Sequence, residues 1–74
     1  MKKKLSEVEF NETGIVSYID EKLKNRIDVM GIRVGKKLKM VTKQPIKGPV
    51  VVIVEGANTS LGLDLAQMIT LEVD

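Results

Sequence analysis

The sequence contains no cysteine, no histidine and no tryptophan, and its only aromatic residues are Phe10 and Tyr18. Without cysteine and histidine the chain forms no disulfide, holds no zinc through these ligands, and lacks both a thiol nucleophile and an imidazole base. The shortage of aromatic rings also disfavours a single-strand nucleic-acid binder, because such proteins stack bases on aromatic side chains. No nucleophile–base pair or group of carboxylates stands out either, so an enzyme is the least favoured class.

Long apolar runs are missing as well. The longest, Val50 to Val54, is far below the roughly 20 residues that span a bilayer. The first ten residues, MKKKLSEVEF, have a charged head but no apolar segment after it, so we expect neither secretion nor a membrane-embedded protein. The chain has 74 residues, of which 43% are hydrophobic and 30% charged. This balance predicts one small folded domain, residues 1–74.

Charge is distributed in blocks, although the net charge is only +2. Residues 22–47 carry nine basic side chains and one acid, whereas residues 5–21 carry five acids and residues 48–74 carry four, with no base in either flank. The basic block can form a face that docks on an acidic surface or on phosphate. The alternative is a solvated strand whose lysines protect it from aggregation. Six of the nine basic residues would form this face: Arg33, Lys36, Lys37, Lys39, Lys43 and Lys47.

Alternation of polar and apolar residues predicts the strands. In TGIVSYI, residues 13–19, Ile15, Ser17 and Ile19 would share one face, opposite Val16 and Tyr18. The next strand, KKLKMVTK at residues 36–43, is half-buried. Its inward side chains are Leu38 and Met40.

The most strand-like segment is VVVIV, residues 50–54, which we expect Gly56 and the following ANTS to end. A turn, QPIKGP at residues 44–49, precedes it. After it, LGLDLAQM predicts a short helix with Leu65, Met68 and Ile69 facing inward. The segment ITLEV forms the last strand, in which Ile69, Leu71 and Val73 share a face.

A short helix is predicted between the first two strands. Asp20 is a good N-cap, and Glu21 suits the first turn. Leu23, Ile27 and Met30 recur at i, i+4 and i+7, which defines one apolar face. The apolar residues that a small barrel leaves exposed beside this helix are a natural docking place for a partner.

The glycines of GIRVG mark structural boundaries. Gly31 has the position of a helix C′ residue, and Gly35 that of a turn into the next strand. A phosphate-binding loop would need a further glycine and a Lys-Ser/Thr pair, which are absent here. The complete order of strands and helices favours a mainly β fold, a small antiparallel barrel whose longer helix caps one open end.

Four segments in order, GIVSYI, LKNRIDVMGIRVGKKLKMV, PVVVIVEG and LGLDLAQMITLEV, resemble the ferrous iron transport protein A (FeoA) family over about residues 5–73. The helix end matches at Arg26, Ile27, Met30 and Gly31, the turn at Gly35, and the closing element at Leu61, Ala66 and Ile69. Two positions depart from the pattern. Val34 stands in place of the turn proline, and Gly62 in place of a polar or basic residue that often follows the closing leucine.

The resemblance implies an SH3-like β-barrel that works in the cytoplasm, without catalysis, on the FeoB-type transporter of ferrous iron. We expect contact through the helix end, the turn after it and the adjoining strand. The candidate contact residues are Arg26, Met30, Gly31, Arg33, Lys36 and Lys37. The alternative is a basic-faced barrel that binds nucleic acid or acts as a detached domain of the metal-dependent repressors that carry the same domain.

A metal site is not expected. Oxygen ligands alone can hold a hard cation, but the acids are scattered, and the one adjacent pair, Asp20 and Glu21, suits helix capping. Borderline metals prefer nitrogen and sulfur ligands, which this chain lacks. The sequence therefore predicts no catalytic residue, no metal ligand set and no cofactor.

Overall fold

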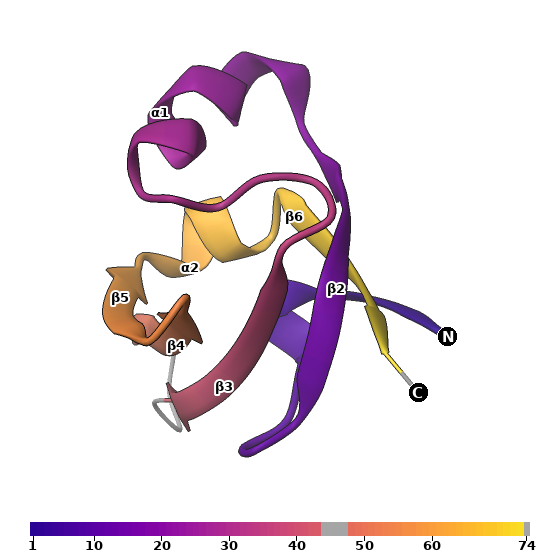
Figure 1. Ribbon diagram of the computed structural model, residues 1–74, viewed down its shortest axis with the longest axis vertical. Helices are drawn as coiled ribbons and strands as arrows, with labels where there is room; N and C mark the ends of the chain where they lie inside the picture. The colour runs from indigo at the N-terminus through magenta and orange to yellow at the C-terminus, as the bar shows by residue number, and fades with distance from the viewer. Residues whose placement is uncertain (44–47, 74) are drawn as a thin grey trace.

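The computed structural model describes residues 1–43 and 48–73. Within them, six strands form one antiparallel sheet in the order β1-β6-β2-β3-β4-β5, and the sheet curls around the core (Figure 1). The strands are β1 Lys2–Lys4, β2 Thr13–Ile19, β3 Lys37–Lys43, β4 Val50–Val54, β5 Ala57–Leu61 and β6 Ile69–Val73. The helical segments are η1 Leu5–Glu7, η2 Glu21–Leu23, α1 Lys24–Val29 and α2 Leu63–Ala66. The predicted small β-barrel, with a helix after the Thr13–Ile19 strand and a short one before the last strand, is confirmed.

The core lies inside the curl of the sheet. The inward residues of β3 are Leu38 and Met40, as predicted, and those of β6 are Ile69, Leu71 and Val73. β4 alternates in the same way, with Val50, Val52 and Val54 buried. Leu5 and Val8, from η1 and the residue after it, are fully buried as well. Alternation alone therefore locates most of the core residues on the strands.

A β-bulge in β2 changes the predicted faces of that strand. The register of β2 on β6 shifts between Val16 and Tyr18, around Ser17. Val16 and Ile19 are buried, whereas Ile15 is 43% exposed. The prediction that Ile15 and Ile19 share a face is therefore wrong, because one extra residue in a strand reverses the alternation that follows it.

Two of the six strands were not predicted. β1 consists of three lysines, a residue depleted in strands, yet it pairs with β6 from Lys2↔Glu72 to Lys4↔Thr70. The residues of β5 were predicted to end the preceding strand and not to form one of their own. In the structure, Glu55 and Gly56 form a two-residue hairpin turn with φ of 50° and 83°. Positive φ at both central residues is the condition for a type I′ turn, which joins antiparallel strands. Glu-Gly is not among its usual sequence signals.

The short helix α2 confirms a predicted element but not all of its contacts. Leu65 packs against the core and Ile69 is buried, as expected. Met68 is 42% exposed, so its predicted inward position is wrong. The helix ends at Ala66, which takes the buried position, and Met68 lies in the turn that follows, where its N–H bonds the Leu65 carbonyl. The predicted turn at residues 44–49 lies mostly outside the described residues.

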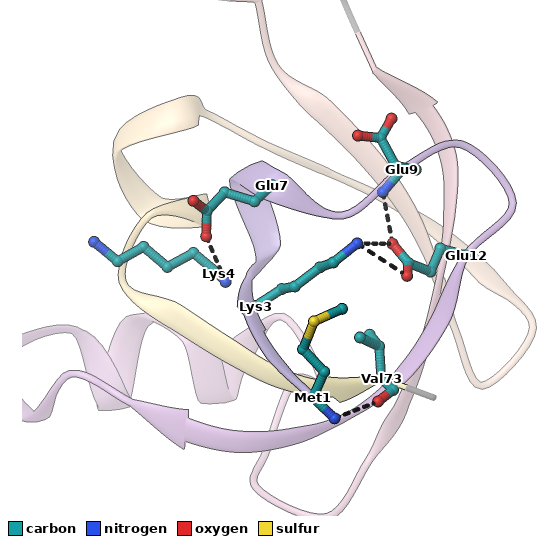
Figure 2. A network of polar contacts seen from close by, with 7 residues as sticks. All are labelled: Met1, Lys3, Lys4, Glu7, Glu9, Glu12 and Val73. Carbon is teal, nitrogen blue, oxygen red and sulfur yellow. Dashed lines mark hydrogen bonds and ion pairs between the residues drawn. The ribbon is translucent and has the colours of Figure 1, made fainter.

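A polar network holds the N-terminal segment to the barrel. Figure 2 shows the Nζ of Lys3 reaching both carboxylate oxygens of Glu12, each at 3.1 Å. The same carboxylate accepts the backbone N–H of Glu9 at 2.9 Å. The hydrogen bond from Glu9 lowers the pKa of Glu12, and Lys3 lowers it further. The network therefore fastens the loop before β2 to the strand β1.

Glu12 makes part of the stability of this protein dependent on pH. Because its pKa is lower in the folded state, its contribution is present above the unfolded pKa and is lost as the pH falls through the folded pKa. We expect the free energy of unfolding to fall as the pH drops below about 4.5, the ordinary pKa of a glutamate, and to fall less in Glu12→Gln. Urea denaturation across this range measures it. Glu9→Gln is the control, because the hydrogen bonds between Glu9 and Glu12 use only the backbone groups of Glu9. Equal slopes for Glu12→Gln and the wild type would contradict the assignment.

Gly14 is required because β6 passes close to it. A Cβ at this position would lie 2.8 Å from Cγ1 of Val73 and 3.0 Å from the carbonyl oxygen of Glu72. We expect Gly14→Ala to lower the free energy of unfolding by about 2 kcal/mol, since the strand must shift to admit the methyl group. Gly62→Ala is the control, with an expected change of at most about 0.5 kcal/mol. Its nearest neighbour is only the movable carboxylate of Asp64. Similar losses in both variants, measured by urea denaturation, would argue against the close approach.

Candidate partner-binding surface

The helical segment after β2 begins and ends with the caps that the sequence predicts. The carboxylate of Asp20 accepts the backbone N–H of Lys22 at 2.9 Å. At the other end, the N–H groups of Gly31 and Ile32 bond the carbonyls of Asp28 and Ile27. With φ of +83° at Gly31, these two bonds form a Schellman motif, which closes a helix. The helix end therefore has one defined exit direction for the chain.

The predicted apolar face of this segment packs on the barrel. Ile27 is fully buried, and Leu23 and Met30 are half-buried against the core. Ile32, just after the Schellman glycine, is also fully buried. These residues fix α1 across one end of the curled sheet (Figure 1), so Met30 offers a partner only part of its side chain.

The turn between α1 and β3 is fastened to β2 through its backbone. Val16 donates its N–H to the Lys36 carbonyl and accepts the N–H of Gly35, both at 2.8 Å. Lys36 in turn donates its own N–H to the Arg33 carbonyl at 3.0 Å. Residues 33–36 thus form a tight turn attached to a central strand. The side chains that it carries project from a rigid base.

The structure brings together three of the six predicted contact residues. Arg33, Lys36 and Lys37 follow one another around the turn and into β3, with Lys37 exposed opposite Ile15 of β2. Arg26 is exposed on α1, one element earlier in the chain. Gly31 has open space at its Cβ position.

Two ion pairs orient the basic side chains of the turn. Arg33 donates Nε–H to the carboxylate of Asp28 at 2.6 Å, linking the turn to α1. Lys36 pairs with Glu55 of the β4–β5 turn. The hydrogen bond and charge of Lys36, with a smaller contribution from Arg33, lower the pKa of Glu55. Within residues 1–43 and 48–73, Lys37 and Lys39 have no such acidic partner.

Two exposed valines beside this turn were not among the predicted contact residues. Val29 is 89% exposed on α1, and Val34 is 58% exposed in the turn. A hollow of about 150 Å³ separates the turn from α1. The exposure of Val29 could have been predicted from the sequence, because it is an apolar residue outside the helix face formed by Leu23, Ile27 and Met30. The residues lining the hollow are Ile19, Lys24, Asp28, Ile32, Arg33 and Val34.

The acidic residues are dispersed over the described part of the chain. No three carboxylates there lie close enough to hold a metal ion, and Asp20 serves as a helix cap. In the same residues, no helix has the length and apolarity needed to cross a membrane. Of the predicted basic face, Lys47 and the side chain of Lys43 lie outside what the structure describes.

Comparison with known families gives one match over almost the whole chain. The family model described as "FeoA domain" matches residues 3–73. Among curated proteins, "Putative Fe(2+) transport protein A" of Methanocaldococcus jannaschii is 40% identical over 47 residues. That alignment covers 64% of this chain and 55% of the relative, so the chain spans about half the relative's length.

Solved structures share the fold. A crystal structure titled "Iron Uptake Regulatory Protein (FeoA)" has a TM-score of 0.91 and 25% identity, with both chains fully covered. An NMR structure of a FeoA-like protein from Clostridium acetobutylicum has a TM-score of 0.86 and 30% identity, covering 97% of this chain and 86% of that one. A manganese-dependent transcriptional repressor has a TM-score of 0.90 at 21% identity, covering 99% of this chain and 42% of that one. The last likeness concerns the fold alone.

Proposed function

Since this chain belongs to the FeoA domain family, whose SH3-like fold it has, we propose that it is a non-enzymatic accessory protein of ferrous iron uptake. In this proposal it acts in the cytoplasm, binds a FeoB-type ferrous iron transporter from that side, and modulates transport through protein–protein contact. The name of the Methanocaldococcus jannaschii relative, an Fe(2+) transport protein, supports the link to iron.

The observation that carries the proposal is a mixed apolar and basic surface on a rigid base. Val34 is exposed between the basic residues Arg33 and Lys36, and Val29 is exposed on the adjoining helix. Protein interfaces typically combine apolar anchors with arginine. The backbone bonds from Val16 hold the turn in place, so little conformational entropy is lost when a partner binds.

The surface is tested by charge reversal at Arg33 and Lys37. We expect the double variant Arg33→Glu/Lys37→Glu to bind the cytoplasmic domain of the transporter at least about tenfold more weakly, a change of about 1.4 kcal/mol. Binding is followed by NMR titration of the isotope-labelled protein, with wild-type shifts clustered on residues 26–39. Because both side chains are exposed, we expect each variant to keep the barrel fold. The amide spectrum of each variant checks this.

Lys2→Glu/Lys4→Glu supplies the matched control, because it reverses two exposed charges on the edge strand β1. The control should bind like the wild type. If the Arg33/Lys37 variant were folded and bound as tightly as the wild type, the proposed surface would be wrong. If the wild type gave no shifts at all, binding to this domain of the transporter would be wrong.

Nucleic-acid binding is the second candidate, and the fold shared with a transcriptional repressor is the observation that favours it. Against it, the chain has only two aromatic residues, and acidic segments flank the basic block. We expect no binding of a short DNA duplex at low salt, measured by fluorescence anisotropy. Binding that weakens steeply as salt rises would support this function instead, because phosphate contacts release counterions.

A further inference from the structure

The outer face of the sheet has a hollow beside the partner-binding surface. About 460 Å³ in volume, it lies over β2, β3 and β4 and reaches the β4–β5 turn. On β3, Lys39 stands between Thr13 of β2 and Ile53 of β4. The residues lining the hollow are Thr13, Lys37, Lys39, Ile53, Glu55 and Gly56.

Positive charge prevails in this hollow. Lys37 and Lys39 form no ion pair with any residue that the structure describes. Glu55 is the one acid among the lining residues, and its carboxylate is engaged by Lys36. Two lysines are therefore available to anionic groups, and the nearest negative charge is already balanced.

Aliphatic side chains stand beside the two lysines. Ile53 lines the hollow next to Lys39. Ile15 is 43% exposed next to Lys37, on the same outer face of the sheet. An occupant that offers both carboxylates and an aliphatic group would match this surface. A nucleic acid would find the lysines but no aromatic ring among the lining residues on which to stack.

The spacing of the two lysines favours an extended occupant. Lys37 and Lys39 are two positions apart on one face of β3, which separates their Cβ atoms by roughly 7 Å. Side chains at i and i+2 of an extended segment have the same spacing and the same direction. On a helix, i and i+2 do not share a face, and neighbours at i+3 or i+4 are only about 5–6 Å apart.

We propose that this hollow binds an extended acidic segment of a partner protein, with carboxylates at alternate positions on Lys37 and Lys39 and an aliphatic side chain against Ile53. This inference rests on the proposed function for the identity of the partner. It adds the chemistry of the segment that the partner contributes. It also extends the binding surface from the turn at residues 33–36 across the sheet.

Two synthetic peptides of equal composition test the spacing. One carries Glu-Ser-Glu-Ser-Val and the other the permutation Glu-Glu-Ser-Ser-Val, each with Gly-Ser flanks and blocked ends. In NMR titrations we expect the alternating peptide to shift the amides of Lys37, Lys39 and Ile53. It should bind about threefold more tightly than the permuted peptide, the difference expected of one exposed ion pair.

Three single variants test the charges. Lys39→Gln should weaken binding of the alternating peptide by about threefold, because it removes a favourable charge. Glu55→Gln should strengthen binding by about twofold, because it leaves Lys36 without its acidic partner beside the hollow. Lys22→Gln is the matched control and should leave affinity unchanged, since this exposed lysine lies in η2, away from the hollow. Glu55→Gln raises the net charge and Lys39→Gln lowers it, so their opposite effects alone could reflect net charge. Lys22→Gln lowers the net charge as Lys39→Gln does, and its unchanged affinity would show that the effect is local to the hollow.

Two outcomes would overturn the inference. One is equal affinity for both peptides with no effect of Lys39→Gln. The other is a single-stranded oligonucleotide that shifts Lys37 and Lys39 while neither peptide does. No transporter is present in this assay, so its result is separate from that of the proposed function. Peptide failure with intact transporter binding overturns only the acidic-segment inference, and peptide binding without transporter binding overturns only the proposed partner.

Discussion

The two backbone hydrogen bonds of Val16 hold the candidate partner-binding surface on the barrel. They attach residues 35 and 36 to the central strand β2, immediately before the bulge at Ser17. Without them, the residues after the Schellman motif would not be held against the sheet, and the basic side chains of the turn would not have fixed positions relative to one another. Backbone bonds in the barrel thus impose order on a surface whose exposed ion pairs contribute little stability.

Most of the fold could be predicted from the sequence because period-two alternation survives in β4, in β6 and in β3 as far as Met40, where the register on β4 shifts. The errors have local physical causes. The bulge at Ser17 has no sequence mark, and it puts Ile15 and Ile19 on opposite faces of the strand. Three lysines form β1 only because β6 offers them an edge. The β4–β5 hairpin depends on positive φ at Glu55, a conformation that few non-glycine residues adopt.

The candidate surface could be predicted only in part. The basic turn residues Arg33, Lys36 and Lys37 follow from the charge pattern, and the structure places them in succession. Their acidic partners, Asp28 and Glu55, could not be predicted because one belongs to α1 and the other to a distant hairpin. These pairs have two effects: they orient Arg33 and Lys36, and they occupy part of their charge. Any anionic partner must therefore compete for these two residues, whereas Lys37 and Lys39 are directly accessible.

The pairing of β1 with β6 joins Lys2 to Glu72, while the β4–β5 hairpin joins residues three to eleven positions apart. Contacts between residues far apart in the sequence cost more loop-closure entropy than contacts within a hairpin, and they therefore form more slowly. The hairpin can therefore form early in folding, and the seam between β1 and β6 closes late. The seam is also the natural place for the native barrel to open locally. Such an opening starts on the opposite edge of the sheet from β4 and β5, so the hollow beside β4 can persist through it.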